Sequence, residues 1–362
     1  MNQQTALIVG NGMDSAHLSY FLLDKDYKVI IGTRRSGSSD NWRLKELGIL
    51  QHPNLKIEAM DLTEFNNVKD IVEKYKFDEI YNLGAQSFVQ SSFGNPYTTN
   101  MSNYMGHINL LEVVRHYSPK SKIYFAASSE MYGKVQEIPQ KETTPFYPRS
   151  PYGVSKLASY WMGVNYRESH NMFICNGILF NHESSLRGEE FVTRKITKKV
   201  AEIKYCLENN LSFTPLVLGN MDAKRDWSYA GDMVEGMWLM LQYNKPDDYV
   251  LCSGDCYMVR EFVDYAFYYA GIPIVWKGKG VDEKVVIRDF FGSSSNGSVL
   301  VEVSPEFFRP CEVDLLKGDC TKAKEILNWK PKYSFSMLVE SMVKADIERT
   351  KSKKIIIRDD CE

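Results

Sequence analysis

The segment Ala6-Leu7-Ile8-Val9-Gly10-Asn11-Gly12-Met13-Asp14-Ser15 decides the fold of this 362-residue chain. Its four apolar residues predict a buried strand that ends at Gly10. The glycines at positions 10 and 12 then open a predicted helix, and the free backbone N–H groups of a helix N-terminus can hold a pyrophosphate. Ser15 stands where the third glycine of such a turn normally allows close packing of helix on strand. We therefore predict a dinucleotide-binding turn, with an ordinary tight turn as the alternative.

Short apolar runs alternate with helical patterns throughout the first half of the chain. A parallel sheet with helices on both faces produces this alternation, because its strands are buried on both sides. We therefore predict an α/β fold, with a Rossmann-type doubly wound parallel sheet and a smaller, mixed α/β substrate-binding lobe. The predicted strands are 6–9, 28–31, 55–60, 79–83, 122–126 and 173–180, and helices are expected around residues 18–22, 68–72, 108–114, 193–207, 259–269 and 323–327.

The predicted domain boundaries follow the change from a regular to an irregular pattern. The nucleotide-binding domain takes residues 1–180 and about 214–255, and the substrate lobe takes about 181–213 and 256–345. Residues 346–362 contain a lysine run and an acidic end, which indicates a flexible tail. The Gly/Ser-rich stretch 291–298 is expected to be an exposed loop.

The composition excludes several classes of function. Lys plus Arg number 44 and Asp plus Glu 46, and the resulting net charge of −2 argues against a general nucleic-acid or polybasic membrane binder. The seven cysteines are scattered and odd in number, which does not fit a disulfide framework. With six histidines and Cys252 and Cys256 as the closest cysteine pair, we expect no metal site. No signal peptide or membrane-length apolar run is found, so we expect a soluble, cytoplasmic protein.

The end of the second predicted strand discriminates between the nicotinamide cofactors. In NAD-binding turns, an Asp or Glu about 20 residues after the glycines binds the ribose 2′-hydroxyl. Arg34 and Arg35 stand at this place instead, and guanidinium groups bind phosphate oxygens bidentately. We therefore predict NADP, with its 2′-phosphate on these two arginines and with Asp61 and Leu62 beside the adenine.

Tyr152 and Lys156 form a candidate catalytic pair. They are four residues apart, so their side chains share one face of a helix. An ammonium group beside a phenol favours the phenolate, which can act as a general base. The predicted strand at 122–126 precedes this pair and leads into Ser128 and Glu130. Ser128 can hydrogen-bond a sugar hydroxyl beside Tyr152, and Glu130 supplies an acid/base that simple alcohol oxidation does not need.

Longer motifs carry a resemblance to a known family. The glycine turn, Ser128, Tyr152 and Lys156 together resemble the extended short-chain dehydrogenases/reductases. Within that superfamily, the chain resembles the GDP-mannose 4,6-dehydratases over about residues 6–331. The motifs are SSEMYGKVQE at 128–137, TPFYPRSPY at 144–152, NHES at 181–184, FVTRKI at 191–196, LGNMDAKRDW at 218–227 and FRP at 308–310.

The resemblance implies an internal redox elimination on a GDP-sugar. Tyr152 would remove the proton of the 4-hydroxyl group while hydride passes from C4 to NADP. Glu130 would assist the loss of the C5 proton and of the 6-hydroxyl group as water. Hydride would then return to C6, which converts GDP-mannose to GDP-4-keto-6-deoxy-mannose. Ser128 and Lys156 complete the implied catalytic set, and the cofactor should stay bound.

The resemblance also implies two sets of binding residues. Lys195, Arg225 and Arg309 suit the pyrophosphate of GDP by their charge. The implied cofactor set is Gly10, Gly12, Met13, Asp14, Arg34, Arg35, Asp61, Leu62, Leu83, Ala85, Ser87, Tyr152, Lys156 and His182. The implied GDP-sugar set is Ser87, Asn181, Glu183, Thr193, Lys195, Leu216, Gly219, Arg225, Arg309 and Glu312. A homodimer or homotetramer is also implied, joined in part by the loop around 34–43.

The chain departs from the family pattern at several positions. Its glycine turn is one residue shorter than the usual GxxGxxG, Ser128 replaces the usual Thr, and Phe88 stands where the family usually has His. Ser185-Leu186-Arg187 likewise replaces a more basic sequence. These changes leave three alternatives open. They are a GDP-D-glycero-D-manno-heptose 4,6-dehydratase, a GDP-sugar C4 reductase or dehydrogenase, and a non-catalytic GDP-sugar-binding relative.

Overall fold

The chain forms two compact units that interleave along the sequence. The computed structural model describes residues 3–34, 41–288, 297–307 and 315–359, with side chains described as far as Ser352. The chain passes from one unit to the other five times. The first unit takes Met1–His182, Ser228–Asp255 and Leu316–Lys332, and the second takes Glu183–Trp227, Cys256–Leu315 and Tyr333–Glu362.

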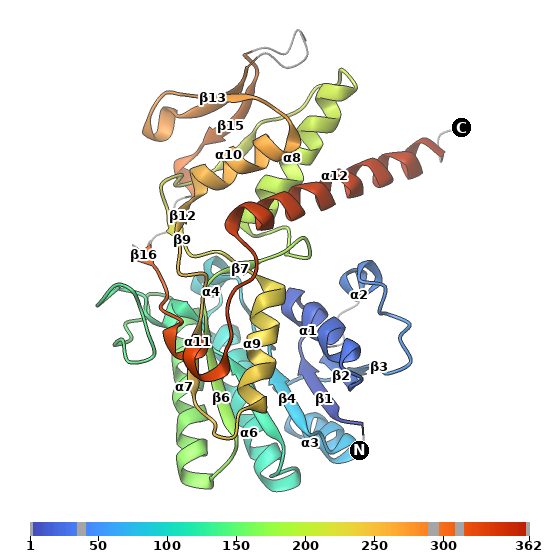
Figure 1. Cartoon of the computed structure of the whole chain (residues 1–362), viewed down its shortest axis with the longest axis vertical. Coiled ribbons are helices and arrows are strands. Elements are labelled where there is room, and N and C mark those ends of the chain that lie inside the picture. The colour runs from blue at the N-terminus through green and yellow to red at the C-terminus, as the bar shows by residue number, and fades with distance from the viewer. Residues whose placement is uncertain (1–2, 35–40, 289–296, 308–314, 360–362) are drawn as a thin grey trace. The chain divides into compact units, whose positions relative to one another are not determined.

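The first unit is built on a seven-stranded sheet in the order β11-β6-β5-β4-β1-β2-β3 (Figure 1). Its strands are parallel, and β1 lies between β2 and β4, with Leu7 opposite both Ile30 and Ile80. The order reverses direction at β1, so the switch point of the sheet lies beside the glycine turn. The strands are β1 Thr5–Val9, β2 Lys28–Thr33, β3 Leu55–Ala59, β4 Glu79–Asn82, β5 Lys122–Ala126, β6 Ile174–Leu179 and β11 Asp248–Leu251.

Helices cover both faces of this sheet. The β1-to-β2 and β3-to-β4 connections run in opposite directions across the sheet, so right-handed crossovers place α1 and α3 on opposite faces. Helix α9 packs on α1, and α6 packs on α3 and α7. The helices of this unit are α1 Met13–Asp24, α2 Trp42–Glu46, α3 Phe65–Tyr75, α4 Val89–Gly94, α5 Pro96–Asn100, α6 Gly106–Tyr117, α7 Pro151–His170, α9 Ala230–Gln242 and α11 Thr321–Leu327, with a π turn η1 at Met101–Met105 and a 3-10 turn η2 at Ser129–Met131.

A core of apolar side chains joins the sheet to the layer of α3 and α6. Leu7, Ile80, Val72, Leu110 and Ile123 are fully buried in it. Burial of each such side chain contributes about 1.5–3 kcal/mol, so the strand runs are strongly selected for apolar residues. The six predicted strands and the expected helices are all present, and the predicted Rossmann-type sheet is confirmed.

The second unit combines a four-stranded sheet with helices α8, α10 and α12, which pack on one another. In the sheet order β13-β14-β15-β8, only the β15–β8 pair is parallel. An aromatic cluster anchors the start of α12, where the rings of Phe335 and Tyr257 stack at 3.9 Å between centroids. The elements are α8 Val192–Glu208, α10 Val259–Ala270, α12 Phe335–Asp359, β8 Leu216–Leu218, β9 Lys224–Arg225, β12 Tyr257–Met258, β13 Ile274–Lys277, β14 Lys284–Ile287 and β15 Val299–Val303. The two-residue strands β7 His182–Glu183, β10 Ser228–Tyr229 and β16 Leu315–Leu316 lie where the sequence passes between units.

Parts of the predicted domain division are wrong. Residues 214–227 belong to the second unit and residues 316–332 to the first. Residues 346–359 do not form a flexible tail, because α12 continues to Asp359 and Asp346 is 2% exposed. The lysine run at 351–354 belongs to the end of this helix, and such a run has the same composition as a frayed terminus. The predicted loop at 291–298 falls largely outside the described residues.

Three structural absences hold for the described part of the chain. No helix in it is long and apolar enough to span a membrane. Its His, Cys, Asp and Glu side chains form no group of three or more that could hold a metal ion. Its cysteines are free thiols, namely Cys175, Cys206, Cys252, Cys256 and Cys320.

Candidate active site

The glycine turn brings the backbone of two strand ends into close contact. Gly10 has a φ of +104°, and a Cβ at this position would lie 3.3 Å from the backbone of Gly84, which follows β4. Gly12 is the N-cap of α1, and a Cβ there would meet no atom within 4 Å. The N-terminus of α1 is therefore bordered by open space, with backbone N–H groups available to an anion. This geometry fits the pyrophosphate of a dinucleotide even though Ser15 replaces the third glycine.

A cavity of about 360 Å³ lies at the carboxyl ends of β1, β2, β3 and β4. Five predicted cofactor residues line it, namely Gly10, Arg34, Asp61, Leu62 and Ala85. Its position at the switch point of the sheet is that of a nucleotide site in doubly wound folds. Sequence reasoning missed several other lining residues, which are Asn11, Thr33, Trp42, Arg43, Met60, Thr63 and Ser102.

Asp14, at the start of α1, faces His182, the first residue of β7. Asp14 Oδ2 lies 3.0 Å from His182 Nε2, and His182 Nδ1 lies 2.7 Å from the carbonyl oxygen of Phe180. Both ring nitrogens of His182 therefore face oxygen atoms, one of a carboxylate and one of a backbone carbonyl. Burial lowers the pKa of the neighbouring His17 to about 4, with the Asp14 charge opposing this shift, so that His17 is neutral at pH 7. The structure thus joins two predicted cofactor residues 168 positions apart.

The predicted catalytic pair, Tyr152 and Lys156, lies in the first two turns of α7. Ser150 caps this helix by accepting a hydrogen bond from the N–H of Gly153 at 3.0 Å. Lys156 Nζ lies 5.9 Å from the ring centroid of Tyr152 and donates a hydrogen bond to the carbonyl oxygen of Ala126 at 2.7 Å. Lys156 is 3% exposed, and this burial lowers the pKa of its ammonium group to about 8. The group is therefore still mostly charged at neutral pH, on the same helix face as the phenol.

Ser128 and Glu130 follow directly after β5, which Lys156 contacts. Ser128 Oγ accepts a hydrogen bond from the N–H of Glu130 at 3.2 Å, and this bond opens the turn η2. A Cβ at Gly153 would lie 2.8 Å from the carbonyl oxygen of Glu130, so glycine lets the first turn of α7 approach this backbone closely. The structure therefore gathers Ser128, Glu130, Tyr152 and Lys156 around the carboxyl end of one strand.

An asparagine that sequence reasoning missed connects this group to the loop after β4. Asn103 lies in the π turn η1 and is 3% exposed. Its amide donates to Ser155 Oγ at 3.0 Å and to the carbonyl oxygen of Gln86 at 3.2 Å, while its own oxygen accepts from the N–H of Gln86 at 2.8 Å. Asn103 thus fixes the segment that carries Ala85 and Ser87 against α7. The one available signal was a polar residue at a buried helical position.

Several predicted GDP-sugar residues lie in the second unit. The Thr193 hydroxyl group donates a hydrogen bond to Glu183 Oε2 at 2.8 Å, and both side chains are buried. Lys195 is exposed, with Nζ 5.7 Å from the ring centroid of Phe307. A Cβ at Gly219 would lie 2.6 Å from the carbonyl oxygen of Phe307, so glycine is needed for this close approach. Leu216 and Arg225 are buried.

The remaining predicted residues divide into described and undescribed positions. Arg35, Arg309 and Glu312 lie outside the described residues. Within them, Met13 is buried, Leu83 is half-buried and Ser87 is exposed. The carbonyl oxygen of Asn181 accepts a hydrogen bond from the N–H of Ser228 at 2.9 Å.

Solved structures of other proteins share this fold. The dTDP-glucose 4,6-dehydratase of Bacillus anthracis, solved with NAD, superposes with a TM-score of 0.76 at 19% identity, covering 96% of this chain and 98% of that one. The RMD protein of Pseudomonas aeruginosa, complexed with NADPH, gives a TM-score of 0.73 at 20% identity, covering 96% of this chain and all of that one. At this identity the likeness establishes the fold alone.

Comparison of sequences is more specific. The chain is 45% identical to the GDP-mannose 4,6-dehydratase of Vibrio cholerae serotype O1, over 98% of this chain and 97% of that protein. It is 47% identical to the GDP-mannose 4,6 dehydratase of Homo sapiens, over 96% of this chain and 92% of that protein. A sequence model of the family described as GDP-mannose 4,6 dehydratase matches residues 7–342. The chain therefore belongs to the GDP-mannose 4,6-dehydratase family.

Proposed function

We propose that this protein is an NADP-dependent enzyme that converts GDP-mannose to GDP-4-keto-6-deoxy-mannose with loss of water. One observation carries the proposal. Ser128, Glu130, Tyr152 and Lys156 meet at the carboxyl end of β5 in a chain about 45% identical to enzymes named for this reaction. Ser128, Tyr152 and Lys156 suffice for alcohol oxidation, and Glu130 adds the acid/base that an elimination requires.

The residues divide the proton transfers between them. A bound nicotinamide would supply the acceptor for the hydride of C4 and the donor of hydride to C6. Tyr152 takes the proton of the 4-hydroxyl group, and the ammonium of Lys156 stabilises the phenolate that does so. The 4-keto group acidifies the C5–H bond, so Glu130 can take this proton and deliver it to the departing 6-hydroxyl group, which leaves as water. The proton held by Tyr152 is finally transferred to C5. All protons and the hydride of the reaction are then accounted for.

The cavity in the first unit supports a nicotinamide dinucleotide, and Arg34 supports NADP in particular. Arg34 is exposed, lines the cavity and follows directly after β2. Position 34 therefore offers a guanidinium group where NAD-binding folds place a carboxylate for the ribose hydroxyls. Asp61 and Leu62 line the same cavity and would lie beside the adenine.

Association into a homodimer or homotetramer is also part of the proposal. Three large apolar side chains are exposed on α5 and α7, which pack on each other. Tyr97 is 76% exposed, Val154 49% and Trp161 55%. A second copy of the chain would bury them, and sedimentation velocity of the wild type and of Trp161→Ser would measure this association.

A product analysis tests the proposed reaction. We expect GDP-mannose to lose one water by mass, with no net change in reduced cofactor. GDP-D-glycero-D-manno-heptose is the second candidate substrate, favoured by Phe88 next to the predicted sugar residue Ser87. Faster turnover of this heptose would reassign the substrate. Net oxidation or reduction of the cofactor would indicate a C4 reductase or dehydrogenase, and binding without turnover would indicate a non-catalytic relative.

A further inference from the structure

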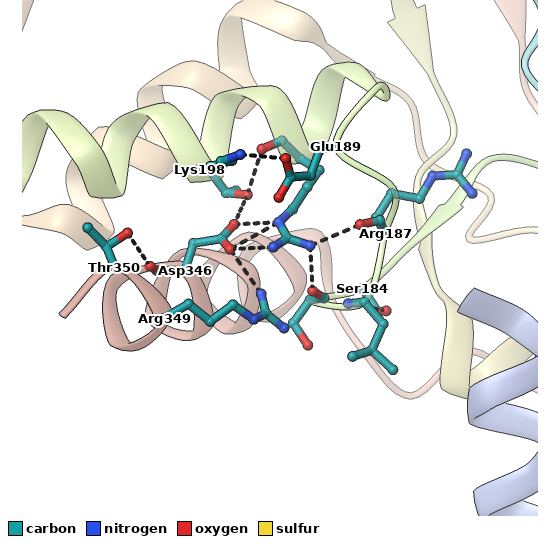
Figure 2. Close-up of polar contacts among 11 residues, drawn as sticks. Ser184, Arg187, Glu189, Lys198, Asp346, Arg349 and Thr350 are labelled. Carbon is teal, nitrogen blue, oxygen red and sulfur yellow. Dashed lines mark hydrogen bonds and ion pairs between the residues drawn. The ribbon is translucent and has the colours of Figure 1, made fainter. Parts of the chain in front are cut away.

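A carboxylate on the last helix is buried in the second unit. Asp346 lies on α12 and binds Arg194 on α8, 152 residues earlier in the chain (Figure 2). Arg194 Nε lies 3.0 and 2.8 Å from the two carboxylate oxygens, and Arg194 Nη2 lies 2.8 Å from Oδ1. The two side chains are 4% and 2% exposed. A guanidinium held at two of its nitrogens by one carboxylate has a fixed plane and orientation.

The third nitrogen of this guanidinium holds a turn of the chain. Arg194 Nη1 donates hydrogen bonds to the carbonyl oxygens of Ser185 at 3.0 Å and of Arg187 at 2.9 Å. These carbonyls belong to the segment 184–187, in which the N–H of Arg187 also donates to the carbonyl oxygen of Ser184 at 3.0 Å. Because Asp346 fixes the plane of the guanidinium, it also fixes the position of these two carbonyls.

The same turn places side chains next to the predicted GDP-sugar residues. Arg187 Nε lies 3.0 Å from Glu183 Oε2, which also accepts the hydroxyl hydrogen of Thr193. The guanidinium carbon of Arg187 lies 3.5 Å from the ring centroid of Phe191, at the N-cap of α8. Movement of the turn would therefore move Arg187, and with it the surroundings of Glu183 and Thr193.

Asp346 has further partners on both helices. It accepts hydrogen bonds from the Thr197 hydroxyl group at 2.7 Å and from Arg349 Nη1 at 2.9 Å. Its charge is thus balanced by two arginines, one on α8 and one on its own helix. Such a carboxylate is held rigidly, which is the property that a support for a binding site requires.

We propose that Asp346 is a positioning residue for the nucleotide-sugar site, acting through Arg194 on the segment 183–187. The proposal rests on the proposed function, because it takes Glu183 and Thr193 as part of the GDP-sugar site. It assigns to the C-terminal helix a role in substrate affinity although Asp346 itself need not contact the substrate. A carboxylate is required, because a neutral amide would present N–H groups toward the guanidinium.

The test compares Asp346→Asn with a matched ion pair elsewhere in the same unit. Arg260 binds Glu283 at 2.8 and 2.9 Å, and Glu283 is also buried. Within the described residues, neither side chain forms a hydrogen bond or ion pair with the segment 183–187. Glu283→Gln therefore controls for general loss of stability. Arg194→Lys keeps the positive charge but cannot donate to both carbonyls and the carboxylate together. The measurements are amide hydrogen exchange, the Kd of GDP and the separate values of kcat and KM for GDP-mannose.

We expect Asp346→Asn and Arg194→Lys to speed exchange of the amides in 184–191 and to raise the Kd of GDP and the KM about tenfold, with kcat changed less than about twofold. Glu283→Gln should change neither the amide exchange of 184–191 nor the Kd of GDP and the KM, even if it lowers Tm as much as Asp346→Asn does. Equal exchange and equal Kd in Asp346→Asn and Glu283→Gln would overturn the proposal. Failure of the wild type to bind GDP or turn over GDP-mannose would instead refute the proposed function, whereas the exchange comparison would still decide whether Asp346 holds this turn.

Discussion

Lys156 Nζ donates a hydrogen bond to the carbonyl oxygen of Ala126, which ends β5 two residues before Ser128. This bond ties the ammonium on α7 to the strand that leads into Ser128 and Glu130. It also explains how a cation can be held where burial lowers its pKa to about 8, since the carbonyl dipole stabilises the charge. We therefore expect Tyr152 and Lys156 to act as a catalytic pair only with β5 alongside.

The pH dependence of turnover should report the loss of the proton from the Lys156 ammonium group. Above pH 8 the ammonium loses its proton, and with it the charge that stabilises the Tyr152 phenolate. We expect kcat to fall on the alkaline side with an apparent pKa near 8, measured from initial rates of product formation at saturating GDP-mannose. A kcat that stays constant from about pH 7 to 9 would contradict this role.

Lys156 should also make stability depend on pH. Its pKa is about 8 in the folded state and about 10.5 in the unfolded state, so the unfolded state binds more protons between these values. The free energy of unfolding should therefore gain on the order of 3 kcal/mol from this group as the pH rises from 8 to 10.5. In urea unfolding curves, Lys156→Met should not show this rise in the free energy of unfolding with pH. A rise that persists in Lys156→Met would show that other groups cause it.

Replacement of Tyr152 by Phe should abolish turnover and leave GDP-mannose binding within about twofold, because only the proton-accepting oxygen is removed. The matched control is Tyr160→Phe on the same helix, whose hydroxyl group donates to Asp248 at 2.9 Å. This control should lose stability and keep turnover. Substantial product formation by Tyr152→Phe, followed by mass spectrometry, would refute the mechanism.

Glu130→Gln should separate the oxidation step from the elimination step. Tyr152 can still remove the 4-hydroxyl proton, but no base remains to take the C5 proton. We therefore expect the variant to accumulate the 4-keto sugar together with reduced cofactor, visible as nicotinamide absorbance in one enzyme equivalent. Normal loss of water would show that another group acts on C5.

Arg34→Ala should weaken NADP binding about 10- to 100-fold and leave NAD binding nearly unchanged, because a charge-assisted bond to a phosphate contributes about 1.5–3 kcal/mol. Lys28→Ala, at the opposite end of β2, provides the control and should change neither Kd. Both Kd values can be measured by isothermal titration calorimetry. Equal weakening of both cofactors by Arg34→Ala would remove the argument for NADP.

His107 should limit stability in acid. It is fully buried, with Nδ1 3.0 Å from Asn82 Nδ2, and burial together with the Lys156 charge lowers its pKa to about 3. The unfolded state takes up a proton below pH 6.5, so the free energy of unfolding should fall by about 2 kcal/mol between pH 6.5 and 5. His107→Gln should lose this dependence in denaturant titrations, whereas His170→Gln at the exposed end of α7 should keep it. An identical dependence in both variants would exclude His107.

The sequence predicted those parts of the molecule in which neighbouring residues carry the signal. The strand at 6–9, its glycine turn and the spacing of Tyr152 and Lys156 are local patterns, and each is selected by burial or by helix geometry. Trp42 reaches the site only through tertiary contacts, so no local pattern marks it. Asn103 is marked only by its polar side chain at a buried helical position, which does not reveal its partners. The buried position of Asp346 was not predicted for a similar reason. A single carboxylate in a polar helix gives no sign of a buried partner 152 residues away.

The predicted domain division failed at its boundaries because sequence pattern records element type and not the unit to which an element belongs. Residues 316–332 follow directly on the second unit, yet α11 packs on β11 and α9 of the first. The strand β11, Asp248–Leu251, was not predicted from the sequence. Tertiary pairing with β6 makes it a strand.

The interleaving of the two units has a consequence for synthesis. Strand β11 forms the edge of the seven-stranded sheet beside β6, but residues 183–227 of the other unit stand between them in the chain. The sheet cannot acquire its last strand until Leu251 has left the ribosome, and α11 follows some 70 residues later. Truncation after residue 182 would therefore leave β6 as an open, hydrogen-bonding sheet edge, which is the kind of surface on which unfinished chains associate.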